Sequence, residues 1–301
     1  MCIRDRADVT TDPIERQRLL TFAVAGGGFA GTETVAELFD LAHSTLRYYP
    51  RVPIGELRFV LVHSGQRILP EIGPELADYA LEKLRGRGIE FHLGVRVASA
   101  TADTLTLNDG TAIHNDTFVW TAGNRPNPLL AGLKCEHGGN GGIIAQPTMA
   151  VEGLDGVWAL GDNASIPDPF SEDGYYPPTA QHALRQGKVL ADNIVATVTG
   201  RPPKSFKFKA IGILVALGHR TAVAEVRGIR FSGIVAWLFW RSVYLSKLPG
   251  LEQKARVLFD WTLDLFFPRD ITLTDNAIIE TPPAKPPTES PKKFPTESNV
   301  R

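Results

Sequence analysis

The sequence predicts an α/β fold, in which the strands of a parallel sheet alternate with helices. A short apolar run at 22–25 has the composition of a buried strand and leads through a glycine-rich turn into a segment of helical periodicity. A second strand is predicted at 57–62, followed by a helix at 74–87 and a third strand at 89–93. Strands that alternate with helices in this way are typical of a parallel sheet covered by helices.

The first predicted strand is followed by GGGFAG, which places glycines at the spacing GxGxxG. Gly26 permits a tight turn, Gly28 lets a pyrophosphate approach the backbone, and Gly31 lets the helix pack close to the strand. The helix N-terminus adds N–H donors and a positive dipole. Because strand, motif and helix occur in this order, the pattern favours a dinucleotide site over a turn that serves packing alone. The residues expected to line this site are Gly26, Gly27, Gly28, Phe29 and Gly31.

Dinucleotide-binding proteins that use NAD usually place Asp or Glu at the end of the second strand, where it holds the ribose 2′-hydroxyl. Here that strand ends in His63 and Ser64. Either side chain is able to hydrogen-bond a ribose, but neither is the expected acid. Two interpretations of His63 stay open, a ribose ligand and a solvated loop residue. The choice between NADH and NADPH stays open with them.

The rest of the first region completes the predicted sheet. Residues 104–107 and 111–113 flank an Asn-Asp-Gly turn, which predicts a β-hairpin. A strand at 117–120 ends in Thr-Ala-Gly. Gly123 is expected to let a loop pass close to a bound nucleotide, with a plain turn as the alternative.

The second region begins with a loop-rich stretch, after which residues 156–162 are predicted as a buried strand that ends in Gly161-Asp162. A carboxylate at such a strand end is able to accept hydrogen bonds from sugar or ribityl hydroxyls. The alternative for Asp162 is a helix cap or turn. A helix is predicted to open at 177–181, with an apolar stripe made of Leu184, Val189, Leu190, Ile194 and Val198.

The composition excludes several classes of protein. The 301 residues allow one large or two medium domains, and the net charge of −1 argues against a nucleic-acid-binding protein. Cys2 and Cys135 are the only cysteines, so the sequence holds no disulfide scaffold, no CxxC motif and no zinc cluster, and no metal site is predicted. It contains neither a signal peptide nor a run of 18 apolar residues.

The charge is unevenly distributed, because residues 201–270 hold 12 Lys and Arg against 5 Asp and Glu. Helices predicted within 229–248 and over 251–267 carry aromatic residues among cations, a pattern suited to a lipid–water interface. The alternative is that their apolar stripes pack against each other. The sequence therefore predicts peripheral attachment to a membrane surface through 229–267. The residues that carry the pattern are Trp237, Trp240 and Tyr244 on the first helix and Val257, Leu258, Trp261 and Leu265 on the second.

Both ends of the chain differ from its middle. Residues 1–6 lack periodicity and are interpreted as a leader foreign to the natural sequence, and Asp12 then begins a short helix. Residues 276–301 hold six prolines and almost no apolar side chains, which predicts a disordered tail.

Together these motifs resemble the type II NADH:quinone oxidoreductases, single-subunit enzymes that pump no protons. The resemblance covers roughly 12–273 and rests on TFAVAGGGFAGTE, ILPEIG, VWTAGNRPNPLL, VWALGDNA, PPTAQHALRQG and the segment 206–270. It implies a Rossmann-like two-dinucleotide-binding flavoprotein fold with an amphipathic, membrane-binding C-terminal region. The expected parts are a leader and short helix at 1–20, an NAD(H)-binding domain at 21–123, the C-terminal part of an FAD-binding domain at 124–203, a membrane-associating domain at 204–275 and the tail at 276–301.

The resemblance also implies roles for single residues. Glu33 is similar to the family's acid near nicotinamide and flavin, and Asp162 to its flavin-contacting Asp. Ala180 and Gln181 match the segment beside the isoalloxazine ring. Gln181 and Gln186 correspond to residues that line the quinone approach, and Lys209 resembles a lysine near that quinone site. The implied chemistry is hydride transfer from NADH to FAD and electron transfer to a quinone. Further residues expected to contact the cofactors are His63, Gly123, Asn124, Gly161 and Ala180.

Two departures from the family pattern limit this reading. His63 replaces the usual acid, and no second GxGxxG precedes Thr21 to bind the ADP part of FAD, so the chain is expected to be the C-terminal two-thirds of the enzyme. The alternatives are a soluble NAD(P)H-dependent ferredoxin-type reductase and a non-catalytic NAD-binding fragment. Sulfide:quinone chemistry is disfavoured because paired cysteines are absent from the sequence. The expected location is the cytoplasmic face of the inner (plasma) membrane, and a homodimer is a further expectation.

Overall fold

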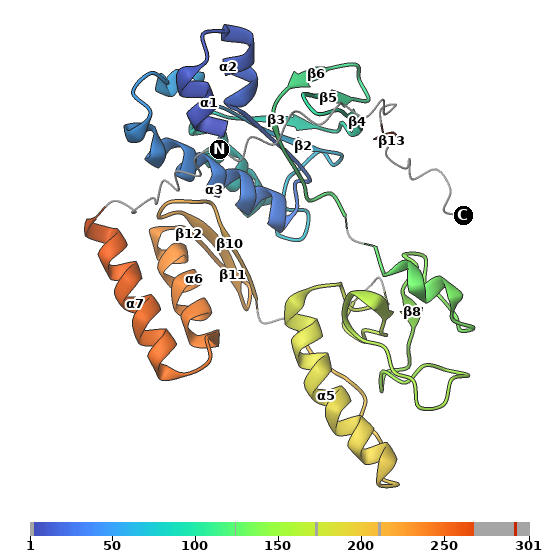
Figure 1. Cartoon of the computed structure of the whole chain (residues 1–301). Coiled ribbons are helices and arrows are strands. Elements are labelled where there is room, and N and C mark those ends of the chain that lie inside the picture. The colour runs from blue at the N-terminus through green and yellow to red at the C-terminus, as the bar shows by residue number, and fades with distance from the viewer. Residues whose placement is uncertain (1–2, 124, 172–173, 210–211, 268–291, 294–301) are drawn as a thin grey trace, which may run out of the picture. The chain divides into compact units, whose positions relative to one another are not determined.

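The chain divides into two compact units. Unit 1 comprises Met1–Ala122 and Gly212–Thr296, and unit 2 comprises Gly123–Ile211. The computed structural model describes residues 3–123, 125–171, 174–209, 212–267 and 292–293 (Figure 1). Unit 2 is therefore inserted into the sequence of unit 1, which is formed from two separate stretches of the chain.

A four-stranded parallel sheet lies at the centre of unit 1. Its order is β3 (Ile89–Leu93), β2 (Arg58–His63), β1 (Thr21–Ala25) and β7 (Thr117–Trp120). All five residues of β1 are buried, as expected for a central strand. Because the strands are parallel, the ends of β1 and β2 meet at one edge, where Ala25 is paired with Val62. The predicted α/β fold with a Rossmann-like sheet is confirmed.

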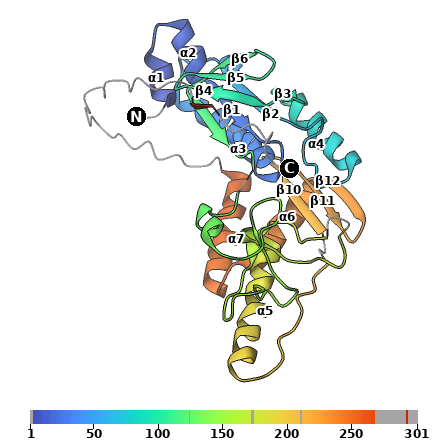
Figure 2. The same cartoon turned by 90° about the vertical axis from the view of Figure 1, so that its right-hand side faces the viewer.

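The two faces of this sheet are covered differently. Helices α3 (Phe29–Thr45) and α4 (Pro74–Gly86) share one core with alternate residues of β1 and β2, and α4 lies beside β3 (Figure 2). The opposite face packs against the meander of β4 (Val97–Ala100), β5 (Thr104–Leu107) and β6 (Ala112–His114). Alternate side chains of a strand point to opposite faces, so β1 and β2 contribute to both cores. The predicted hairpin is confirmed in β5 and β6.

Two short helices precede β1. The predicted helix is α2 (Pro13–Leu19), and the Asp12 side chain caps it by accepting a 2.9 Å hydrogen bond from the Ile14 N–H. The stretch interpreted as a foreign leader largely lies in α1 (Ile3–Val9). This helix forms without apolar periodicity because one small residue, Ala7, packs against Leu19 and Leu20. The origin of residues 1–6 stays a prediction.

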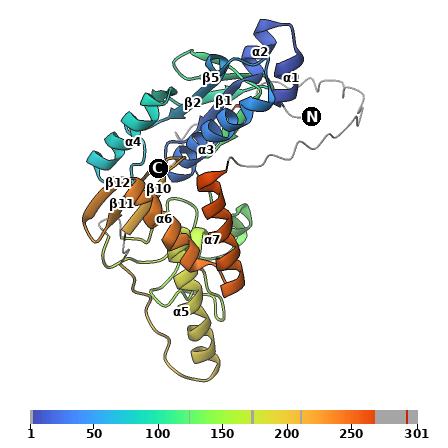
Figure 3. The same cartoon turned by 90° about the vertical axis from the view of Figure 1, so that its left-hand side faces the viewer.

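The second stretch of unit 1 adds an antiparallel sheet and two helices. The sheet is β10 (Gly212–Ala216), β11 (Ala222–Val226) and β12 (Ile229–Gly233). Val215, Leu217 and Val223 enter the same core as α3 and α4. Helix α6 (Ile234–Lys247) covers the sheet's other face, and α7 (Leu251–Phe266) runs alongside α6 (Figure 3).

The helix predicted within 229–248 begins only at Ile234, because the first five residues of that segment form β12. They pair with all of β11, and Gly233 ends the strand at φ +74 before the helix begins. Cross-strand hydrogen bonds to β11 therefore outweigh the local helical pattern. Among the described residues, no helix has both the length and the apolar character needed to span a membrane.

Unit 2 has little regular structure apart from α5 (Ala180–Val198) and the two-residue strands β8 (Ile143–Ile144) and β9 (Ala164–Ser165). The strand predicted at 156–162 is wrong. Only Trp158 forms a bridge, to Ala150, and Gly161–Asn163 is a 3₁₀ turn. The 157–159 backbone bonds to the loop at 149–151, which is too short to build a ladder.

The apolar stripe predicted on α5 is only partly correct. Val189 and Leu190 pack into the core of unit 2, but Leu184 and Val198 are 68% and 79% exposed. Apart from Leu190, the buried face of the helix is polar, with His182, Gln186 and Asn193. Asn193 shows why: its amide donates to the carbonyls of Thr148 and Lys204, so hydrogen bonds orient the helix.

The predicted C-terminal tail lies almost wholly outside the described residues. Within it, β13 (Lys292–Lys293) pairs antiparallel with β4. The prediction of disorder for the rest of 276–301 stays a prediction.

Candidate functional site

The glycine turn, residues 26–31, follows β1 and opens α3. Two of its glycines, Gly26 and Gly31, are enclosed by backbone atoms and Thr121. Gly26 has φ +113, and a Cβ there would lie 2.6 Å from Thr121 Oγ1. A Cβ on Gly31 would fall onto the Gly26 carbonyl oxygen and 2.7 Å from Thr121 Oγ1. Gly26 and Gly31 are therefore required for the tight turn and for the close approach of α3 to β1 and β7.

Gly28 differs from these two. It caps α3 with φ −75, a value open to any residue, and a Cβ there would approach only the Glu71 carboxylate oxygen, at 3.3 Å, among the described atoms. Backbone geometry and internal packing therefore do not require glycine at this position. The bare Cα at the start of a 17-residue helix leaves space where N–H groups and the helix dipole favour an anion.

His63 contacts the turn directly. The Gly27 N–H donates to His63 Nδ1 over 3.1 Å, and a Cβ on Gly27 would lie 2.6 Å from the imidazole ring. Burial lowers the pKa of His63, although the Glu71 charge and the Arg67 backbone carbonyl raise it. Because Nδ1 accepts a hydrogen bond, the neutral ring carries its proton on Nε2. The end of β2 is thus held against the glycine turn.

Glu33 lies in the second turn of α3 and is half-buried. Its Oε1 accepts a 3.0 Å hydrogen bond from the Ala216 N–H, which joins α3 to β10 within unit 1. Burial raises the pKa of Glu33, the Ala216 N–H lowers it, and Glu37 raises it further. Glu33 also adds to the raised pKa of Tyr244, whose main cause is burial. Glu33 therefore holds a proton more readily than a solvated glutamate does.

Unit 2 brings together the Gly-Asp turn and α5. Gly161, at φ +65, donates its N–H to Gln186 Oε1 over 2.8 Å, and Gln186 is only 3% exposed. The Asp162 side chain next to this turn is exposed. At the start of α5, Ala180 is exposed and the Gln181 carbonyl accepts from Arg185. Gln186 thus fixes the turn that presents Asp162.

The remaining predicted site residues are placed as follows. Gly123 is exposed and has φ +85, and Lys209 is exposed. Asn124 lies outside the described residues. The structure brings Gly26–Gly31 together with His63 in unit 1, and Gly161 and Asp162 together with Gln186 in unit 2. Phe29 is half-buried in the first turn of α3.

Sequence reasoning missed His182, which is 4% exposed on α5. Its Nδ1 lies 2.7 Å from Thr179 Oγ1, and burial lowers its pKa, with Asp168 raising it and Arg185 lowering it. Its position one helical turn before Gln186 was the available signal, because residues four apart share a helix face. It also missed Glu71, which approaches Gly28.

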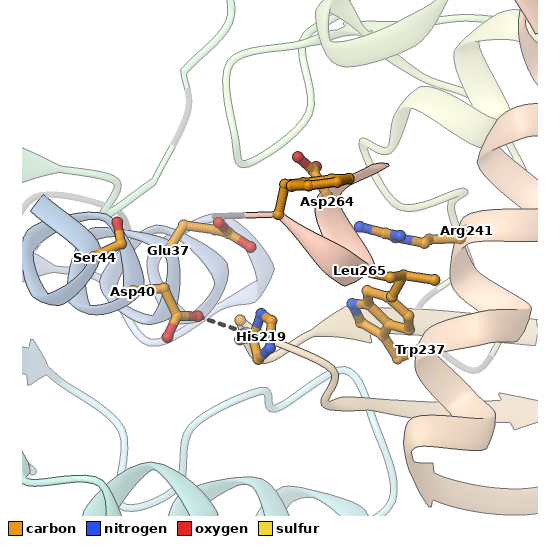
Figure 4. Close-up of a pocket in the computed structure, with 10 residues that line it drawn as sticks. Glu37, Asp40, Ser44, His219, Trp237, Arg241, Asp264 and Leu265 are labelled. Carbon is orange, nitrogen blue, oxygen red and sulfur yellow. Dashed lines mark hydrogen bonds between the residues drawn. The ribbon is translucent and has the colours of Figure 1, made fainter. Parts of the chain in front are cut away.

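An open cavity of about 300 Å³ lies elsewhere in unit 1, between α3, the β10–β11 turn and the two C-terminal helices (Figure 4). Asp40 accepts hydrogen bonds there from Arg87 and, at 2.5 Å, from the His219 N–H. On the other wall, the Arg241 guanidinium lies 3.9 Å from the Trp237 ring centroid. None of the predicted cofactor or catalytic residues lines this cavity. Within the described part of the chain, no group of three or more His, Cys, Asp or Glu side chains is arranged to hold a metal.

Two family models match the chain. Residues 4–187 match the model of the family described as pyridine nucleotide-disulphide oxidoreductase, and residues 211–270 match the NDH2 C-terminal domain. The structure of NDH2 from Plasmodium falciparum in complex with NADH superposes with a TM-score of 0.80 at 16% identity, over 90% of this chain and 71% of that one. This likeness shows the fold.

Two curated relatives are similar over most of the chain. A probable NADH dehydrogenase of Dictyostelium discoideum is 33% identical over 88% of this chain, and a type II NADH:quinone oxidoreductase of Mycobacterium tuberculosis is 29% identical over 90%. The chain spans 58% and 60% of their respective lengths. These matches confirm the resemblance stated from the motifs.

Proposed function

Because the chain belongs to the pyridine nucleotide-disulphide oxidoreductase family and carries its NDH2 C-terminal domain, we propose that it forms the NADH-docking and quinone-facing part of a type II NADH:quinone oxidoreductase. The reaction is hydride transfer from NADH to FAD, followed by electron transfer to a membrane quinone without proton pumping. The names of its relatives support this proposal.

One observation carries the proposal. Gly26 and Gly31 are enclosed by protein atoms, whereas Gly28, at the N-terminus of α3, faces space that the described protein atoms leave open apart from Glu71. A pyrophosphate placed there would meet backbone N–H groups and the positive end of the helix dipole. His63, at the end of β2, marks the side on which the adenosine ribose would lie.

The residues of unit 2 fit the flavin end of FAD. Asp162 presents an exposed carboxylate suited to ribityl hydroxyls, and Ala180 and Gln181 lie at the N-terminal end of α5, which offers N–H donors. The flavin would supply the acceptance of a hydride and the onward transfer of electrons. The sequence contains one GxGxxG, at the glycine turn proposed to bind NADH. Asp162, Ala180 and Gln181 would therefore contact the ring and ribityl part of FAD rather than its ADP part.

The chain's own residues would hold a proton near the nicotinamide and position the turn that contacts the flavin. Glu33, with its raised pKa, would hold a proton near the nicotinamide end. Gln186 would act as a positioning residue, because it holds the Gly161 N–H and thereby the turn that carries Asp162. Gln181 and the exposed Lys209 remain proposed for the quinone side.

Purification of the full 301-residue chain tests the proposal. We expect NADH fluorescence to change on binding, and we expect bound flavin to give a yellow spectrum when FAD is supplied during refolding. If NADH binds but no flavin is retained, the chain is a non-catalytic NAD-binding fragment, the second candidate, which its 58–60% share of the relatives' length supports. If neither cofactor binds, both candidates are wrong. The NDH2 C-terminal domain match argues against a ferredoxin-type reductase.

We also propose attachment to a membrane surface through α6 and α7. Helix α7 has no buried residue, and Leu251, Phe259 and Phe266 are 85%, 63% and 77% exposed. On α6, Val235 and Leu238 are 62% and 52% exposed. Interfacial helices bury such apolar faces among lipid headgroups, and the basic excess of 201–270 would add attraction to anionic lipid.

The residues that carry this surface differ in part from those expected. Trp237 is 6% exposed and packs inside unit 1, and Trp261 is half-buried, with Arg241 lying 3.9 and 4.8 Å from the two rings. By contrast, Leu258 and Leu265, which were expected on the same face as Trp261, are 53% and 40% exposed. Trp237 and Trp261 therefore lie on the inner face of α6 and α7, and the aliphatic and phenylalanine side chains lie on the outer face.

Replacement of Leu258 and Phe259 by serine should reduce cosedimentation with anionic vesicles by at least about tenfold, since each buried apolar side chain contributes roughly 1.5–3 kcal/mol. Ile14→Ser, which removes an apolar side chain 76% exposed on α2, is the matched control and should leave binding unchanged. Equal binding by all three proteins, or no binding by the wild type at low salt, would remove the membrane proposal.

The finer aspects of location and assembly are proposed on the same basis. A peripheral enzyme that takes electrons from cytoplasmic NADH would attach to the cytoplasmic face of the inner (plasma) membrane. A homodimer is proposed without a specific interface, and the mass of the purified chain in solution is its test.

A further inference from the structure

We propose that the loop after β2 accepts a 2′-phosphorylated dinucleotide, so that the chain binds NADPH at least as tightly as NADH. The inference rests on the proposed docking of a dinucleotide at the glycine turn and concerns only its adenosine end. The loop is residues 64–69, between His63 and Pro70, and is called the β2 loop below.

The end of β2 lacks the group that normally rejects a 2′-phosphate. An acid at this position holds the ribose 2′-hydroxyl of NADH and repels the phosphate of NADPH. Here the position is occupied by His63, and its ring touches the turn through the 3.1 Å bond from the Gly27 N–H. A neutral imidazole adds no negative charge beside the ribose, so the usual electrostatic selection against NADPH is missing.

The β2 loop is anchored at both ends on one residue of the glycine turn. His63 precedes the loop and accepts from the Gly27 N–H, and Leu69 closes it by donating its N–H to the Gly27 carbonyl over 2.6 Å. Between these anchors, the Gly65 carbonyl accepts from the Gly94 N–H after β3. The intervening side chains are therefore held around the end of β2 that the adenosine ribose would reach.

Two of these side chains are suited to a phosphate. Ser64 and Arg67 are exposed, and a hydroxyl and a guanidinium are both able to donate hydrogen bonds to a phosphate. Arg67 pairs with Asp78 of α4 at 3.4 Å, and their side chains are 48% and 64% exposed. An exposed ion pair of this kind contributes little to the free energy of folding, so Arg67 is able to exchange Asp78 for a phosphate.

Glu71 is the carboxylate that faces the glycine turn. Its position places it at the pyrophosphate rather than at the adenosine ribose. Its Oε1 lies 3.3 Å from the Cβ position of Gly28, where the pyrophosphate would bind. The Glu71 charge also reaches His63 and raises the pKa of that ring, but the Glu71 carboxylate lies beside Gly28 rather than at the end of β2. It therefore does not replace the missing ribose acid.

The test measures the dissociation constants of NADH and NADPH for the full chain from the fluorescence of the reduced nicotinamide. For the wild type we expect the NADPH constant to be no larger than the NADH constant. His63→Glu should weaken NADPH binding at least about tenfold through like-charge repulsion and leave NADH within about threefold. Arg67→Gln, at an exposed position that should not disturb folding, should weaken NADPH alone by about tenfold.

Arg51→Gln removes one positive charge from an exposed position outside the loop and should leave the ratio of the two constants unchanged. The inference is overturned if NADH binds and the dissociation constant of NADPH is larger than that of NADH. It is also overturned if Glu71→Gln, rather than the His63 or Arg67 variant, changes the ratio. If neither dinucleotide binds, the proposed docking at the glycine turn is itself wrong, and the inference falls with it.

Discussion

Replacing Gly28 with valine is expected to abolish detectable NADH binding while leaving unit 1 folded. The Gly28 backbone is in a conformation open to all residues, and the Glu71 carboxylate is the only described group that a Cβ would approach. A valine side chain would fill the space in which we place the pyrophosphate and would separate it from the helix N–H groups. Hydrogen bonds to charged groups contribute roughly 1.5–3 kcal/mol each, so losing two should weaken NADH at least about 100-fold.

The measurement is a fluorescence titration with NADH, with circular dichroism to follow folding. Gly55→Val is the matched control, because Gly55 is a unit 1 glycine with no neighbouring atom within 4 Å of its Cβ position. It should bind NADH as the wild type does. Unchanged binding by Gly28→Val would show that the dinucleotide docks elsewhere. The open space at Gly28 would then no longer support the proposed function.

Replacing Gly31 with alanine is expected to have the opposite effect, a loss of stability whether or not NADH is present. The new methyl group would fall onto the Gly26 carbonyl oxygen and 2.7 Å from Thr121 Oγ1. Neither atom is the far end of a flexible side chain, so α3 must move away from β1 and open the core. Overpacking of this kind costs about 3 kcal/mol or more when the backbone is unable to relax.

Urea denaturation followed by circular dichroism measures this loss. Gly28→Ala, three residues earlier in the same turn, is the control and should change the free energy of unfolding by less than about 1 kcal/mol. Similar stability of the two variants would mean that α3 does not pack on β1 as closely as described. The two glycines would then have been assigned to the wrong roles.

The features that were predicted from the sequence are those determined by local chemistry. The GxGxxG spacing identifies β1, the turn and α3, and the Asn-Asp-Gly turn identifies the β5–β6 hairpin, because each needs only neighbouring residues. Asp12 likewise caps α2 through a bond two residues away. In each case the signal and the structure lie within one short segment.

The features that sequence reasoning missed or placed differently depend on partners distant in sequence. Residues 229–233 join a sheet because β11 is available to pair with them, which a helical pattern does not reveal. On α5, the hydrogen bonds from the Asn193 amide to the carbonyls of Thr148 and Lys204 decide which side of the helix is buried. The contact of His63 with Gly27 and the burial of Gln186 against Gly161 belong to the same category, since each joins residues at least 25 positions apart.

The shared core of unit 1 has a consequence for how the protein is made. Val215, Leu217 and Val223 pack with Val24, Val35 and Leu61, although all of unit 2 is translated between the two groups. Domains generally fold as the ribosome releases them, but here the early sheet would wait for some 90 intervening residues before its apolar surface is covered. We expect nascent chains that stop near 211 to expose this surface and to engage chaperones. Those that extend past α6 should become resistant to protease.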